Sequence, residues 1–154
     1  MHYRFEPGMG DLGETSPKFL HAGDFPIVTR SIVVKQGQKL AYGSVVGRID
    51  GDDAQHVLCC KISTPAATAE QPNPQAVAVA DGSEKPQGIL SEDVDASEGD
   101  KEAVIYLTGQ FNYNAMNFGE GYADENGVPS QDITDRLRIL NIYMEKGVKA
   151  HPRT

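Results

Sequence analysis

The sequence lacks any long apolar run and any excess of positive charge. No segment approaches the roughly 20 consecutive apolar residues that a membrane-spanning helix requires, and the first residues, Met1–Pro7, lack the apolar stretch of a signal peptide. Lys and Arg number 14 against 22 Asp and Glu, which gives a formal net charge of -8. Such a chain lacks the basic surface that neutralises phosphates. We therefore expect a protein made in the cytoplasm that binds neither membranes nor nucleic acid.

Reactive groups at the spacing of known motifs are absent as well. The two cysteines, Cys59 and Cys60, are adjacent, and adjacent side chains of a strand point to opposite faces. The sequence has no Cys-x-x-Cys pair, which a redox or zinc site would use. The four histidines never stand at metal-ligand spacing, and no nucleophile elbow, phosphate-binding loop or dinucleotide-binding glycine motif occurs. We expect packing thiols, no metal, no cofactor and no enzymatic activity.

What the chain does have is the length of one domain and many turn signals. It has 154 residues, of which 39% are apolar, with 16 Gly and 9 Pro, values typical of a turn-rich soluble protein. Proline removes backbone donors and disfavours helix at the residue before it, so Pro65, Pro72 and Pro74 predict a loop over residues 64–74. Short apolar runs separated by Gly, Asp and Pro predict strands over residues 31–34, 39–42, 44–49, 57–62 and 76–80.

The C-terminal part contains one convincing helical pattern, over Asp132–Lys146. Apolar residues recur there at helical spacing and would line one face. They are Ile133, Leu137, Leu140 and Met144. A shorter helix is the alternative, because Arg138–Tyr143 also reads as a strand that contains the β-formers Ile139 and Tyr143.

The first 30 residues show no sustained period of either two or 3.6 and are interrupted by Pro and Gly, which predicts an extended arm. The arm carries more apolar bulk than a solvating linker normally has. Its large apolar residues include Tyr3, Phe5, Phe19, Leu20 and Phe25. We expect these side chains to dock on another chain, and the alternative is that the segment packs on its own domain.

The segment between residues 86 and 112 reads as strand, acidic turn and strand. The strands are Gln87–Leu90 and Ala103–Thr108, and the turn between them is rich in Asp, Glu, Ser and Gly. The turn is not an EF-hand calcium loop, because Glu98 replaces the glycine of the sixth position and Val104 the glutamate of the twelfth. Large apolar groups follow, for which we expect a place in the core or in a contact between subunits: Phe111, Tyr113, Met116 and Phe118.

Four short motifs carry a resemblance to a known family. They are Gly88–Leu90, Asp93–Ser97, Thr108–Asn112 and, more loosely, Gln36–Arg48. Together they resemble the head decoration proteins of tailed bacteriophages, the family of the phage lambda decoration protein D. The resemblance covers roughly Ser31–Met144, and this chain is longer than the lambda protein, mainly in Ser63–Asn73 and in Asn126–Thr154.

The resemblance implies a mainly β fold of the β-clip type, a bent ribbon or incomplete barrel with a small helical part. It implies a decoration domain over residues 31–154 and a capsid-binding arm over residues 1–30. It also implies a homotrimer on the outside of the expanded head, at three-fold and quasi-three-fold positions. There it would bind the major capsid protein and stabilise the shell against the pressure of packaged DNA, as a component of the virion.

Two other classes remain open. A phage tail or baseplate component, or a receptor- or glycan-binding β-domain, would have the same β-rich sequence texture. A dUTP-hydrolysing enzyme shares the β-clip architecture, but such enzymes complete their site with a glycine-rich C-terminal arm. This chain ends instead in Lys149–Thr154, which contains no glycine.

Overall fold

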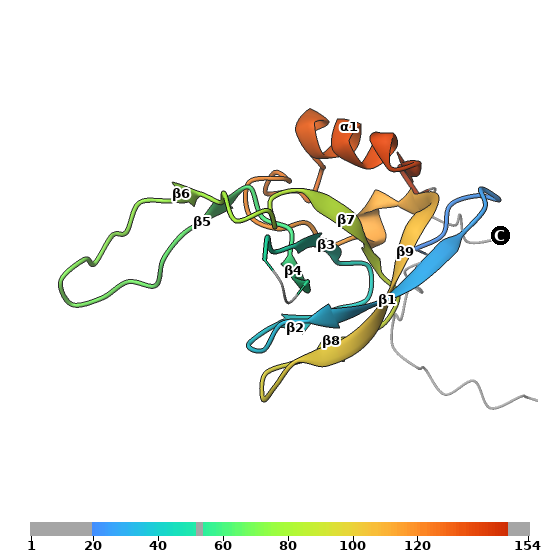
Figure 1. Cartoon of the computed structure of the whole chain (residues 1–154). Helices are drawn as coiled ribbons and strands as arrows, with labels where there is room; N and C mark the ends of the chain where they lie inside the picture. Colours follow the sequence, from blue (N-terminus) through green and yellow to red (C-terminus); the bar gives the residue numbers. More distant parts are fainter. Residues whose placement is uncertain (1–19, 52–53, 148–154) are drawn as a thin grey trace, which may run out of the picture.

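The computed structural model describes residues 20–51 and 54–147, and these residues form a mainly β domain with a small helical part, as predicted (Figure 1). The longest strand, β9, spans Lys101–Asn112, and the helix α1 spans Gln131–Ile139. The other elements are β1 (Val28–Val34), β2 (Lys39–Leu40), β3 (Val45–Arg48), β4 (Gln55–Leu58), β5 (Ile62–Ser63), β6 (Val77–Ala78), β7 (Pro86–Leu90), β8 (Val94–Asp95), the 3-10 turn η1 (Tyr113–Ala115) and β10 (Ile142–Glu145).

The main sheet has the strand order β1-β4-β3-β7-β9-β10, and it is partly closed because β1 also pairs with β9. The β1–β9 pairing is antiparallel and runs along the whole of β1, whereas β1 meets β4 in parallel only at Val33 and Val34. Strand β9 is long enough to pair with β1, β7 and β10 along its length. It therefore joins the two ends of the sheet.

Two apolar clusters lie on opposite faces of β3 and β7. Val45 and Ile89 belong to the first cluster, and their chain neighbours Val46 and Leu90 belong to the second. Successive side chains of a strand point to opposite faces, so one apolar run can supply both clusters. This explains why these strands are apolar at consecutive positions instead of alternating with polar residues.

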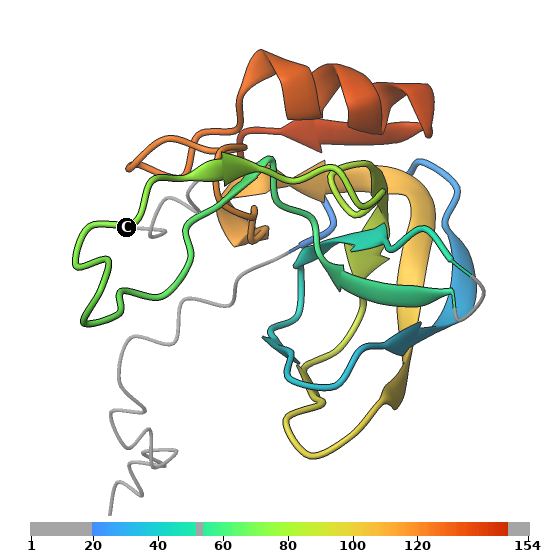
Figure 2. The same ribbon diagram turned by 60° about the vertical axis from the view of Figure 1, so that its left-hand side comes forward.

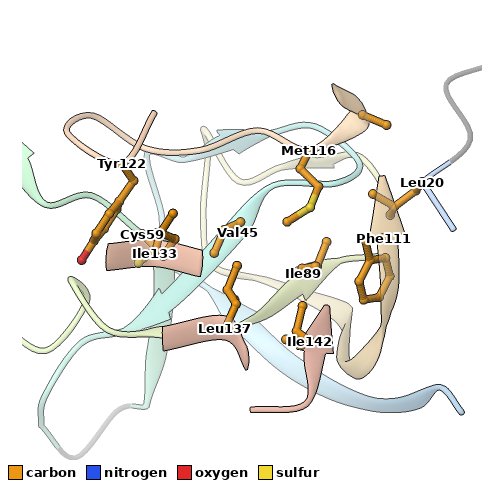
Figure 3. Packing of buried hydrophobic residues seen from close by; sticks show 11 residues of the cluster. Leu20, Val45, Cys59, Ile89, Phe111, Met116, Tyr122, Ile133, Leu137 and Ile142 are labelled. Atoms are coloured by element: carbon orange, nitrogen blue, oxygen red, sulfur yellow. The ribbon is translucent and has the colours of Figure 1, made fainter. Parts of the chain in front are cut away.

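The helix α1 covers the first of these clusters. Its buried residues Ile133 and Leu137 pack with Val45, Cys59 and Ile142 (Figure 3). In Figure 2, α1 lies along β10 at the upper side of the domain. Of the predicted apolar face, Ile133 and Leu137 lie on α1 and are buried, whereas Leu140 and Met144 follow the helix.

The prediction that the helix extends to Lys146 was wrong. The helix ends at Ile139, and after a tight turn the chain returns as β10. Asn141 has φ +60°, a left-handed conformation that asparagine tolerates better than most residues. Strand β10 then pairs with β9, with Ile142 opposite Gly109. The alternative of a strand after a shorter helix was therefore correct in kind, although the strand begins later than Arg138.

The predicted strand over residues 57–62 is divided in two. Strand β4 ends at Leu58 and β5 begins at Ile62, with the two cysteines between them. Cys59 is fully buried in the first cluster, and this burial raises the pKa of its thiol to about 12. Cys60 is half-buried. The predicted loop lies between β5 and β6 and projects from the body of the domain in both ribbon views (Figures 1 and 2).

Candidate interaction surface

The N-terminal segment is fastened to the domain at Leu20. The N–H of Asn112 donates to the carbonyl of Leu20 (2.6 Å), and the N–H of Ala22 donates to the carbonyl of Gln110 (2.9 Å). The side chain of Leu20 is 1% exposed and packs in the first cluster, which differs from the expectation that it meets another chain. Its burial gives the chain a fixed point where it joins the end of β9.

Aromatic contacts hold the residues after Leu20 against the same part of the sheet. The ring of His21 lies edge-on to Tyr106, with ring centres 4.9 Å apart, and 5.4 Å from the ring of Phe111. The ring of Phe25 lies edge-on to Tyr143 of β10, at 5.0 Å. Such offset and edge-to-face pairs are the favoured arrangements of aromatic rings. The N-terminal segment thus contacts both β9 and β10.

Three large apolar side chains within residues 25–28 of this segment remain accessible. Phe25 is 36% exposed, Ile27 45% and Val28 50%. The backbone there is satisfied, because the N–H of Val28 donates to Oγ1 of Thr108 (3.0 Å). Exposed apolar side chains gathered in one stretch of a soluble protein mark contact surfaces more often than scattered ones do. We call these three residues the apolar strip.

The other residues singled out from the sequence lie in different places. Phe111 is fully buried and Met116 nearly so, both in the first cluster, while Tyr113 and Phe118 are half-buried against it. Tyr3, Phe5 and Phe19 lie outside the described residues.

Five exposed apolar residues were not predicted from the sequence as contact residues: Ile27, Val28, Val77, Val128 and Ile139. The exposure of Ile139 could have been predicted from the helical spacing. Ile139 does not lie on the helical face that Ile133 and Leu137 define, and it is 81% exposed. The apolar strip is too short to show a periodic pattern in the sequence. Its exposure depends on the tertiary structure, which leaves these three side chains uncovered.

The acidic turn after β7 contains a strand and uses its carboxylates within the chain. Strand β8 pairs antiparallel with β2. Asp93 accepts a hydrogen bond from the N–H of Tyr42 (2.7 Å), and Asp100 accepts from the N–H of Gln36 (2.7 Å) and from Nε2 of Gln55 (2.6 Å). These oxygens are therefore engaged by amide groups. Over residues 20–51 and 54–147, no group of three or more His, Cys, Asp and Glu stands in an arrangement that would hold a metal ion.

Among the described helices, none is long and apolar enough to cross a membrane.

The fold and its surface define a mainly β domain with an N-terminal segment fastened at one end and an apolar strip beside it. A family model of the bacteriophage lambda head decoration protein D matches residues 14–129. Because this match spans more than half of the chain, the chain belongs to that family of phage head decoration proteins. A search of the curated proteins finds none that matches the chain.

Membership identifies the chain as a structural component of the phage capsid. The matched range contains the motifs on which the sequence resemblance rests, from Gln36–Arg48 to Thr108–Asn112. It begins at residue 14, inside the N-terminal segment, and ends before α1. The helix and β10 therefore lie outside the matched range.

Proposed function

We propose that the chain is a trimeric cement protein that binds the major capsid protein on the outside of the expanded head and stabilises the shell against DNA pressure. The family match carries this proposal. On the same grounds we propose that it has no catalytic role, that it is made in the host cytoplasm and that it resides in the virion, at three-fold and quasi-three-fold positions of the head.

The proposed capsid-gripping part is the N-terminal arm, with residues 31–154 as the decoration domain. The buried side chain of Leu20 and the pairing of β1 with β9 favour an arm that ends before Leu20, shorter than the 30 residues expected from the sequence. The apolar strip next to this fixed point is a second contact candidate. Phe111 and Met116, being buried, contribute by supporting the strand to which the arm is fastened.

An arm that becomes ordered on binding loses about 1–2 kcal/mol of backbone entropy per residue. Burial of its aromatic side chains and strand addition to a capsid edge would offset this loss. Trimerisation adds to the effect, because after one arm has bound the others bind intramolecularly and avidity rises by about 10²–10⁴. A weak single arm is then enough for firm decoration.

Co-sedimentation with expanded, DNA-free heads tests the proposal. The full chain should saturate the heads at a fixed ratio to the major capsid protein. Its mass in free solution, measured by light scattering, should be three times the 16.7 kDa of one chain. A chain that fails to bind heads but binds cells or glycans would instead be a receptor-binding or tail component, and dUTP hydrolysis would indicate the enzyme class.

Two variants distinguish the contribution of the arm to head binding from that of the apolar strip. Deletion of residues 1–19 keeps Leu20 in the core, so the domain should stay folded and lose head binding. A triple substitution of Phe25, Ile27 and Val28 to Ser removes the apolar strip and leaves the arm in place. Head binding by the deletion variant at the level of the full chain would contradict the arm proposal. Loss of head binding only in the triple variant would show that the apolar strip, and not the arm, makes the capsid contact.

A further inference from the structure

A cavity opens where β1 and β4 part from one another. The two strands pair only at Val33 and Val34, and the cavity is lined by the residues of β1 just before this point and by Ala54 and His56 on the other side. Its volume is about 330 Å³. Ligand pockets in proteins commonly measure about 300–1,000 Å³. The space is therefore large enough for a small organic group.

The charged residues at the mouth of the cavity give a net positive charge in a chain of net charge -8. Arg30 and Arg48 line it together with one acid, Glu102. All three residues are exposed, and none takes part in an ion pair with another described residue. Two guanidinium groups against one carboxylate leave one positive charge uncompensated.

His56 lines the same cavity and is nearly buried, at 8% exposed. Its Nδ1 atom is buried and has no hydrogen-bond partner among the residues that the structure describes. Burial lowers the pKa of His56. The backbone carbonyls of Val33 and Ala54 act to raise this pKa, and the positive charges of Arg48 and Arg30 act to lower it. The imidazole is therefore neutral near pH 7, and the net charge of the lining stays at one.

The remaining lining is partly apolar. Ile32 and Ile105 are buried there, and Leu107 is half-buried. A ligand that fills the cavity must therefore present carbon to these side chains and negative charge to the arginines. A phosphate would present charge to the arginines but no carbon to Ile32, Ile105 and Leu107, so it suits this lining less well.

We propose that this cavity binds a carboxylate carried on a short apolar stem, with Arg30 and Arg48 donating hydrogen bonds to its oxygens. The planar guanidinium group suits this because its N–H groups match the geometry of a carboxylate. The carboxylate comes either from a free organic acid or from an acidic side chain of another protein chain. The site does not depend on whether the chain decorates a phage head.

Titration of the isotopically labelled full chain, followed by NMR, tests the site. The probes are butyrate, its uncharged analogue butyramide, and inorganic phosphate. Butyrate should produce saturable shifts in the ring signals of His56 and the backbone amides of residues 30–33. Butyramide should produce none, and phosphate should bind more weakly than butyrate. The absence of saturable shifts with butyrate, or equal shifts with butyramide, would overturn the proposal.

Four variants locate the charges. R30Q and R48Q should each weaken butyrate binding at least about tenfold, because each removes a charge-assisted hydrogen-bond donor. E102Q should tighten binding, since it removes the one negative charge of the lining. R138Q is the matched control, because Arg138 is exposed on α1 and does not line the cavity. If R138Q weakened butyrate binding as much as R30Q, the binding would come from general charge attraction, and the proposed site would be wrong.

A last comparison identifies the source of the carboxylate. A blocked Gly-Glu-Gly peptide and its Gly-Gln-Gly analogue are titrated in the same way. Tighter binding of the glutamate peptide than of butyrate would indicate a protein partner. Tighter binding of butyrate would indicate a free acid, and binding of the glutamine peptide as strong as that of the glutamate peptide would contradict carboxylate recognition.

Discussion

Single side chains of α1 have very different roles although they are neighbours in sequence. Leu137 is fully buried, whereas Ile139, two positions further, is 81% exposed. Asp132, at the start of the helix, accepts a hydrogen bond from Nε of Arg136 within the helix (2.7 Å). It also accepts one from Nζ of Lys61 (3.0 Å), which links the helix to the residue before β5. The stability of this region therefore depends on a few positions.

Leu137→Ala should lower the free energy of unfolding by about 2–5 kcal/mol, because it removes buried methyl groups and leaves a cavity. Ile139→Ala should change it by less than about 0.5 kcal/mol, as a surface substitution. Urea unfolding of the two variants and the parent chain measures both values. Equal losses in the two variants would contradict the burial of this helix face.

The ion pairs of Asp132 predict a dependence of stability on pH. The side chain of Arg136, and then that of Lys61, hold the pKa of Asp132 below its usual value. A depressed pKa contributes stability above the unfolded-state pKa, and this contribution is lost as the pH falls through the folded-state pKa. Since the pairs are on the surface, Asp132→Asn should cost about 0.5–1 kcal/mol near pH 7.

Urea unfolding between pH 7 and about pH 2.5 checks this, because the difference between parent and Asp132→Asn should vanish at the acidic end. Asp135→Asn is the control on the same helix. Asp135 accepts a hydrogen bond from Gln131 (2.8 Å) but forms no ion pair with a described residue. A loss in Asp132→Asn that stays constant with pH would show that the ion pairs are not its cause.

At the scale of the elements, the connection between β2 and β3 is held from two sides. The N–H of Gly43 donates to the carbonyl of Leu90 (2.9 Å), and the N–H of Asn117 donates to the carbonyl of Gly43 (3.0 Å). Gly43 thus joins the end of β7 to the chain that follows η1. It has φ +86°, and an added Cβ would lie 2.5 Å from the backbone oxygen of Ala115.

Gly43→Ala should therefore destabilise the chain more than Gly37→Ala. Both glycines have positive φ, which costs an ordinary residue about 1–3 kcal/mol. A Cβ on Gly37 would meet no atom within 4 Å. The crowding at Gly43 should add at least about 1 kcal/mol to its loss. Thermal or urea unfolding of the pair decides this, and similar losses would mean that the backbone near Ala115 yields easily.

For the whole molecule, the N-terminal segment is part of the fold from Leu20 onward. Leu20 fills a place in the first cluster, beside Phe111 and Met116. The main chain on both sides of His21 is hydrogen-bonded to β9, through Leu20 and Ala22. The domain therefore includes residues that the sequence assigned to an arm.

Deletion of residues 1–27 should lower the free energy of unfolding relative to deletion of residues 1–19. Loss of the buried Leu20 side chain alone removes about 1.5–3 kcal/mol of apolar burial. Urea midpoints of the two shortened chains provide the measurement. If the two chains unfold at the same urea concentration, residues 20–27 contribute nothing to the domain.

The sequence by itself determined the class of the fold. Short apolar runs between glycine-containing turns require strands, and the spacing of Ile133 and Leu137 requires a helix with one apolar face, because both patterns depend only on nearby residues. The motifs from Gly88 to Asn112 also gave the family. The proline-containing loop after β5 was predictable for the same local reason.

Only the tertiary structure decided the end of α1, the place of Leu20 and the cavity beside His56. Strand β10 forms because β9 offers it a partner at Gly109–Asn112, about 30 residues away in the sequence. Leu20 is buried and Phe25 partly exposed although both are apolar residues of the same segment, since exposure depends on which distant elements cover each side chain. Arg30, Arg48 and His56 meet because β1, β3 and β4 are brought together by pairing, which no local pattern encodes.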